Sequence, residues 1–89
     1  MSLDIVQRVR EGVTFLDLTG RITMGEEVGK FREVIQTLAK DASPKAVLNM
    51  ASVDYIDSTG LGAVVMSSTA LGKAGGTVKL LNLNRRTWS

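Results

Sequence analysis

The start of the chain has a pattern of two short runs rich in apolar residues around a turn, and this pattern is typical of a β-hairpin. It predicts strands over residues 3–10 and 13–19. Glu11 and Gly12 are the only residues between them. Such a two-residue connection favours a hairpin with glycine in the left-handed region. The second strand is apolar on both faces, so we expect it in the interior of a sheet.

Apolar residues then recur at intervals of three and four, which indicates an amphipathic helix. The apolar positions with this spacing are Val28, Phe31, Val34, Ile35 and Leu38. Glu26 and Glu27 precede them, and negative charge near a helix N-terminus is favourable. The helix should end before residues 41–44, which end in the chain's one proline.

A third strand is predicted over residues 46–50, joined by a short connection to a second helical repeat over residues 61–71. Gly75 or Gly76 should end this helix in the left-handed conformation. A fourth strand is predicted over residues 77–83.

The succession of strand, helix, strand, helix and strand predicts an α/β fold with two crossovers between parallel strands. Right-handed crossovers that advance in one direction place both helices on the same face of the sheet. We therefore expect one domain over residues 1–89, with a mixed four-stranded sheet in the order 1-2-3-4. The N-terminal hairpin makes the first strand antiparallel at one edge.

A hydroxyl side chain stands where the third strand gives way to the second helix, in the sequence Asp-Ser-Thr-Gly-Leu-Gly of residues 57–62. Ser58 falls at the predicted helix start, where unpaired N–H groups and the helix dipole favour a negative charge such as a phosphate. The alternative is that Ser58 or Thr59 only caps the helix, since both residue types are common caps.

Gly60 and Gly62 weigh against a merely structural role for this motif. Two glycines in the first turn of a helix lower its stability by about 1 kcal/mol each relative to alanine. We expect both to permit close approach of the helix to the sheet or to a partner.

Composition excludes several kinds of site. The chain of 89 residues has no cysteine and no histidine, so disulfides, Cys/His zinc sites and Ser-His nucleophile pairs are excluded. The sequence shows no signal peptide and no apolar stretch long enough to cross a membrane. We expect a cytoplasmic protein without catalytic residues, metal or cofactor.

The net charge is +2, and all nine acidic residues lie at or before Asp57. The basic C-terminal part holds Lys73, Lys79, Arg85 and Arg86. Four charges are fewer than nucleic-acid binding usually recruits, so we expect a solvated surface and no direct nucleic-acid partner.

Five further side chains have a structural and a functional interpretation. Met24, Met50 and Met66 are expected in or near the core, the alternative being an adaptable binding surface. Asp54 and Asp57 are expected to serve turns or caps on the connection before the second helix, the alternative being a metal or acid/base pair.

Several stretches together resemble the STAS domains of anti-sigma factor antagonists. These are residues 47–50, 53–56 and 57–62, and the Gly75–Gly76 pair before the strand that begins at Val78. The resemblance extends over nearly the whole chain. In that family the serine of the Asp-Ser-x-Gly-Leu-Gly motif is phosphorylated by an anti-sigma factor serine kinase, which implies that Ser58 is the switch residue.

The resemblance implies a switched protein-binding module and no enzyme. The unphosphorylated form would bind the anti-sigma factor and free the sigma factor, and phosphorylation would break that complex, so that the module regulates transcription. The expected switch surface around Ser58 comprises Thr23, Asp57, Thr59, Gly60, Leu61 and Gly62. Two alternatives are a STAS module that holds a small ligand, anion or nucleotide on donors at Gly60 and Leu61, and a scaffold subunit of a signalling complex.

Two departures from the family pattern affect what is expected. Thr23 stands where family members often have an aspartate near the switch serine, and threonine supplies no negative charge. Family members also continue into a final helix, which is missing after Ser89. The apolar surface left without it would favour self-association, with Trp88 in or near the contact.

Overall fold

A tight N-terminal hairpin begins the fold, and the computed structural model describes residues 3–82. The elements in chain order are β1 (Leu3–Arg10), β2 (Val13–Ile22), α1 (Glu26–Leu38), β3 (Lys45–Ile56), α2 (Ser58–Lys73) and β4 (Thr77–Leu81). Glu11 and Gly12 form the turn with φ values of 52° and 80°. Two consecutive positive φ values give the hairpin turn whose twist matches that of the strands.

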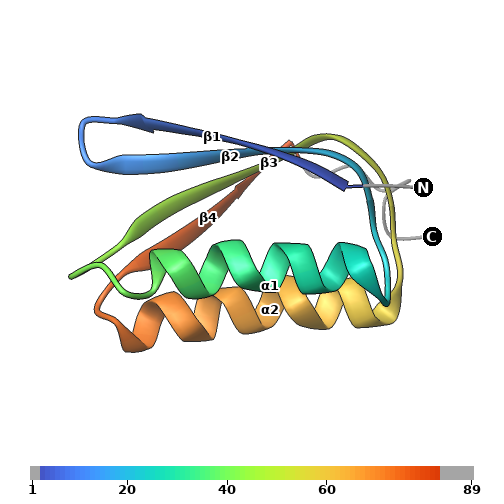
Figure 1. Ribbon diagram of the computed structural model, residues 1–89. Coiled ribbons are helices and arrows are strands. Elements are labelled where there is room, and N and C mark those ends of the chain that lie inside the picture. The colour runs from blue at the N-terminus through green and yellow to red at the C-terminus, as the bar shows by residue number, and fades with distance from the viewer. Residues whose placement is uncertain (1–2, 83–89) are drawn as a thin grey trace.

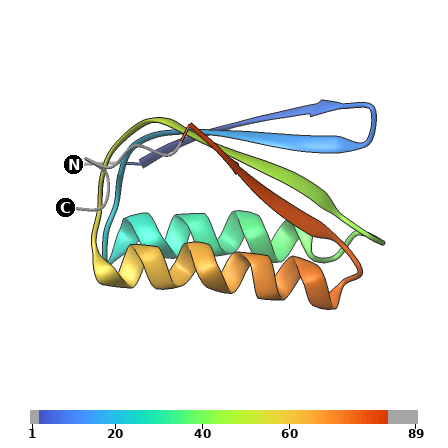
Figure 2. The same ribbon diagram turned by 180° about the vertical axis from the view of Figure 1, so that it is seen from behind.

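The four strands lie side by side in the order β1-β2-β3-β4. β1 is antiparallel to β2, and β2, β3 and β4 are parallel. Both helices cover the same face of the sheet, as Figures 1 and 2 show from opposite sides. The predicted fold class, strand order and position of the helices are confirmed.

The core fills the space between the sheet and the two helices. α1 contributes Val28, Phe31, Ile35 and Leu38, the predicted stripe apart from the half-buried Val34. The strands contribute every second residue, as Leu16, Leu18, Leu48 and Met50 show. Neither helix within residues 3–82 is long and apolar enough to cross a membrane.

The strands β2 and β3 are longer than predicted. β3 does not stop at Met50 but continues to Ile56, so Asp54 lies in a strand and not on a connection. The pairing with β2 shifts register between Asp17 and Thr19, which lie opposite Asn49 and Ser52. A bulge of this kind absorbs a break in the apolar alternation without ending the strand.

The methionines divide between core and surface. Met50 is fully buried, whereas Met24 is 72% and Met66 59% exposed. Core packing was the wrong expectation for these two, because Met24 lies on the connection between β2 and α1 and Met66 on the outer side of α2.

Gly75 ends α2 in the predicted left-handed conformation, with φ of 83°. The amide of Gly76 then donates to the carbonyl oxygen of Leu71 at 2.8 Å, a pattern that satisfies the last helical carbonyls. The last predicted strand residue Leu83, the pair Arg85 and Arg86, and Trp88 lie outside the described residues.

Candidate functional site

Ser58 is the first residue of α2, and its side chain is exposed to solvent. The helix begins directly after β3, and the amide of Asp57 donates to the carbonyl oxygen of Ile22 at the end of β2. The ends of two neighbouring parallel strands therefore fix the place of Ser58. The predicted exposure and position of this hydroxyl are confirmed.

Asp57, and neither Ser58 nor Thr59, caps α2. Its Oδ1 accepts from the amide of Gly60 at 2.7 Å, and its Oδ2 accepts from the amide of Met24 at 2.9 Å. These hydrogen bonds, first the one from Met24 and then the one from Gly60, lower the pKa of the Asp57 carboxyl. One carboxylate thus joins the start of α2 to the connection between β2 and α1.

The same contacts change the expectation for anion binding at the helix start. The amide of Gly60 donates to the Asp57 carboxylate, and the amide of Leu61 donates to the Asp57 carbonyl oxygen at 2.8 Å. Both donors on which the anion-binding alternative depended are therefore engaged. A phosphate on Ser58 would have the Asp57 carboxylate as a neighbour, and it could not use the amides of Gly60 and Leu61 without displacing these contacts.

Gly60 and Gly62 differ sharply. A Cβ built on Gly60 would overlap the carbonyl oxygen of Ile22, whereas a Cβ on Gly62 would meet nothing within 4 Å. Close approach of helix to sheet is confirmed for Gly60. It is wrong for Gly62, which faces open space on the outer side of α2.

Thr23 lies on the connection that Asp57 holds, next to Met24. Its hydroxyl donates to Glu27 Oε1 at 3.4 Å, and its carbonyl oxygen accepts from the amide of Val28 at 3.2 Å. The structure thus brings Thr23 and Asp57 to the same end of the molecule as Ser58. Glu27, which the sequence interpretation did not single out, supplies a carboxylate beside Thr23.

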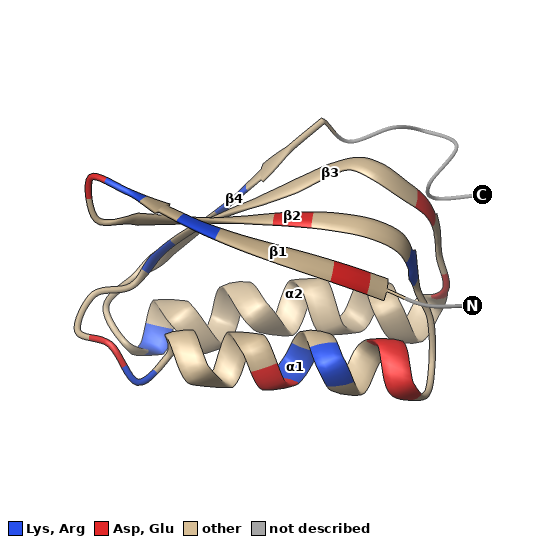
Figure 3. Cartoon of the chain, turned by 45° about the horizontal axis from the view of Figure 1, so that its top comes forward, with Lys and Arg blue, Asp and Glu red and all other residues tan. Residues whose placement is uncertain are grey.

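α2 carries no charged residue before Lys73 at its end, whereas α1 carries several (Figure 3). No Asp, Glu, Lys or Arg occurs from Ser58 to Gly72. Val65 is 58% exposed, and Leu61 and Met66 are also exposed. The sequence interpretation did not include Val65 or Met66 in the site. The absence of charge over four helical turns was the signal that could have identified them.

Hollows flank α2 on both sides. One of about 280 Å³ lies between α1 and α2, beside Met66. The other, of about 350 Å³, lies between α2 and β4 and is lined in part by Leu61 and Val65. Together with the exposed side chains, these open hollows make the surface around α2 more typical of a protein-binding surface than of a closed ligand pocket.

A pH series tests the Asp57 contacts. Its pKa is lowered in the folded state, so its ionised form stabilises the protein above its ordinary pKa, and this stabilisation is lost as the pH falls through the lowered value. We expect Asp57→Asn to melt below the wild type near neutral pH, with a difference that shrinks in acid. Thermal denaturation from neutral pH to about pH 2 measures this.

Asp54→Asn is the matched control, because Asp54 is exposed on β3 and its side chain makes no hydrogen bond or ion pair within residues 3–82. It should melt like the wild type. A deficit of Asp57→Asn that stays the same at every pH would contradict a role for the carboxylate charge.

Comparison with known protein families gives one family match. The family model of the STAS domain matches residues 4–88, which is nearly the whole chain.

Solved structures share the fold at low sequence identity. A putative anti-sigma factor antagonist from Thermotoga maritima superposes with a TM-score of 0.82 at 21% identity, over 93% of this chain and 71% of that chain. The anti-sigma factor antagonist SpoIIAA in its unphosphorylated form gives 0.73 at 21% identity, over 92% and 74% of the two chains. Mglu gives 0.77 at 25% identity over 90% of this chain, which spans only 20% of Mglu.

Proposed function

This chain belongs to the STAS domain family, and from that membership we propose that it acts as an anti-sigma factor antagonist whose partner binding is switched off by phosphorylation of Ser58. In this proposal the unphosphorylated domain sequesters an anti-sigma factor kinase and thereby releases a sigma factor. The phosphoryl transfer is carried out by that kinase, and the domain contributes only the accepting hydroxyl.

The observation that carries the proposal is the place of Ser58 at one end of an uncharged, exposed helix face. The exposed apolar side chains of Leu61, Val65 and Met66 continue from it along α2. Uncharged apolar surface of this kind is typical of the centre of a protein interface. Two solved structures with this fold are described as antagonists or putative antagonists of anti-sigma factors.

Phosphorylation would act on this surface through charge. A phosphate adds about −1.5 to −2 charges at neutral pH. At Ser58 it would stand beside the Asp57 carboxylate, whose nearest N–H partners are already bonded. The new charge would therefore stay hydrated. Docking of the partner would have to remove this water, and the free energy of that desolvation would weaken the complex. The fold itself need not change.

Phosphorylation by a purified anti-sigma factor kinase from the same genome tests the switch. With ATP, the wild type should gain one phosphate by intact mass, and Ser58→Ala should gain none. A phosphate on Thr59 or Thr23 in the alanine variant would show that another hydroxyl is the acceptor. Absence of any phosphate on the wild type would contradict the switch.

Binding of the same kinase is the second measurement. Ser58→Asp should weaken binding at least about tenfold, because it adds a charge to the interface. Ser52→Asp makes the same change at an exposed position on β3 and should leave binding unaltered. Full affinity of Ser58→Asp, together with no phosphorylation, would favour the scaffold function on the same surface.

A further inference from the structure

The face of the sheet opposite the helices is uncovered within residues 3–82 (Figures 1 and 2). β2, β3 and β4 are parallel, and parallel strands usually have both faces covered. Val13, Phe15 and Val47 lie on this open face and are half-buried there by their neighbours. Nothing within residues 3–82 therefore covers the apolar centre of this open face.

Cations surround this centre. The strand registers place Arg8, Phe15, Val47 and Lys79 in one row across all four strands, and Arg10, Val13 and Lys45 in the adjacent row. With adjacent strands about 4.8 Å apart, Arg8 and Lys79 stand about 14 Å from each other across the row. We call these seven residues the basic sheet surface.

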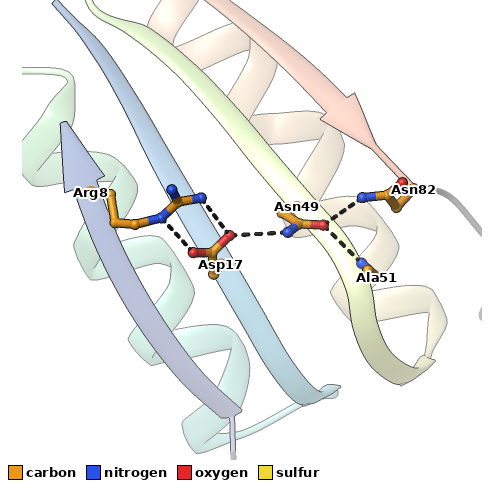
Figure 4. A network of polar contacts seen from close by, with 5 residues as sticks. All are labelled: Arg8, Asp17, Asn49, Ala51 and Asn82. Carbon is orange, nitrogen blue, oxygen red and sulfur yellow. Dashed lines mark hydrogen bonds and ion pairs between the residues drawn. The ribbon is translucent and has the colours of Figure 1, made fainter. Parts of the chain in front are cut away.

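A polar network fixes one border of this surface (Figure 4). The Arg8 guanidinium donates to both carboxylate oxygens of Asp17, at 2.8 and 3.3 Å, and lies 5.4 Å from the centre of the Phe15 ring. Asn49 donates to Asp17 at 3.0 Å and accepts from Asn82 at 2.9 Å. The network holds Arg8 in place, and the charges of Arg8 and Asp17 neutralise each other.

The other three cations are not neutralised in this way. Among residues 3–82, no side-chain hydrogen bond or ion pair reaches Arg10, Lys45 or Lys79. Lys45 pairs with Thr77, two residues before Lys79, so the two ammonium groups lie on diagonal neighbours of the same face. Like charges so placed repel, and an anionic partner would relieve that repulsion.

We propose that the basic sheet surface binds an acidic segment of a partner protein, at a site separate from Ser58. Carboxylates would pair with Arg10, Lys45 and Lys79, and an apolar side chain between them would rest on Val13 and Val47. A nucleic acid is disfavoured because it usually recruits more cations and several stacked rings, whereas this surface offers three free cations and one ring that Arg8 already covers.

The test uses a synthetic decapeptide of glutamates with a central phenylalanine, titrated into the intact protein and followed by backbone amide NMR. The shifts should map to the open face of β1 to β4 and weaken with added salt. A glutamine version of the peptide should not bind. Shifts confined to the helices, or equal binding of the glutamine peptide, would overturn the proposal.

Matched charge variants locate the site. Lys45→Gln/Lys79→Gln should weaken peptide binding about tenfold. Lys40→Gln/Lys73→Gln removes the same charge at exposed positions after α1 and at the end of α2, and should have less than about a twofold effect. If both double variants lost the same amount of peptide affinity, the effect would come from the net charge of the protein and not from this surface, which would contradict the proposal.

Two further arms separate this site from other partners and from the proposed switch. Ser58→Asp should bind the peptide with the affinity of the wild type. Peptide binding therefore tests the basic sheet surface even if Ser58 is not a switch. Tighter binding of a thymidine oligonucleotide of equal charge, or of phosphatidylserine vesicles, would assign the surface to another class of partner and overturn the proposal.

Discussion

Gly60→Ala is expected to destabilise the protein by at least about 3 kcal/mol. The added Cβ would overlap the carbonyl oxygen of Ile22, which is backbone and cannot rotate away. α2 would have to move from the end of β2, and with it the amide that Asp57 caps. Gly60→Val should be worse still, although valine has the better helix propensity. Urea denaturation measures the loss.

Gly62→Ala is the matched control two residues further along the same helix. It adds a methyl group into open space, and alanine favours a helix over glycine by about 1 kcal/mol. It should therefore keep or raise the stability. Equal unfolding free energies for the two alanine variants would contradict the close contact between α2 and β2.

Gly76→Ala is expected to cost a similar amount, at least about 3 kcal/mol, at the opposite end of α2. Its Cβ would overlap the carbonyl oxygen of Pro44, which also accepts from the amide of Thr77 at 2.9 Å. The substitution should therefore loosen the start of β4 against β3. The expected signature is a lower melting temperature with faster hydrogen exchange of the β4 amides.

Gly72→Ala provides the comparison, since a Cβ there meets nothing within 4 Å. It should melt at or above the wild-type temperature. If Gly76→Ala keeps both its melting temperature and its β4 protection, the contact between Gly76 and Pro44 does not limit how the strand is attached.

Local sequence patterns predicted most of the fold because they report on the nearest neighbours of each residue. The hairpin, the stripe of α1 and the cap at Gly75 each depend on a few adjacent positions. The end of β3 did not follow from such patterns. Its polar residues after Met50 stay in the strand because β2 pairs with them across a bulge, and that partner is far away in the sequence.

The candidate site shows the same division. The exposure of Ser58 followed from its place before an apolar helical repeat. Three consecutive residues, Asp57, Ser58 and Thr59, could each cap a helix. Asp57 caps α2 because β3 ends directly before it. Its bond to Met24 joins positions 33 residues apart, and no periodicity contains that information.

The basic sheet surface was also invisible in the sequence as a cluster. Arg8, Lys45 and Lys79 are single cations in three separate strands, and the sequence interpretation counted the C-terminal ones as solvated charges. Only the register places Lys79 in the row of Arg8 and Phe15. One-residue slips would turn each cation to the helix side of the sheet.

The spatial order of the strands, which equals their order in the chain, has a consequence for how the protein is made. Of the strands in residues 3–82, the two of the hairpin leave the ribosome first, and they need only a two-residue turn to meet. Each later strand then arrives at a free edge of the existing sheet, preceded by the helix that covers it. Among these four strands, none has to be inserted between two others that have already paired. These four strands can therefore assemble in the direction of synthesis, with β4 joining after the other three.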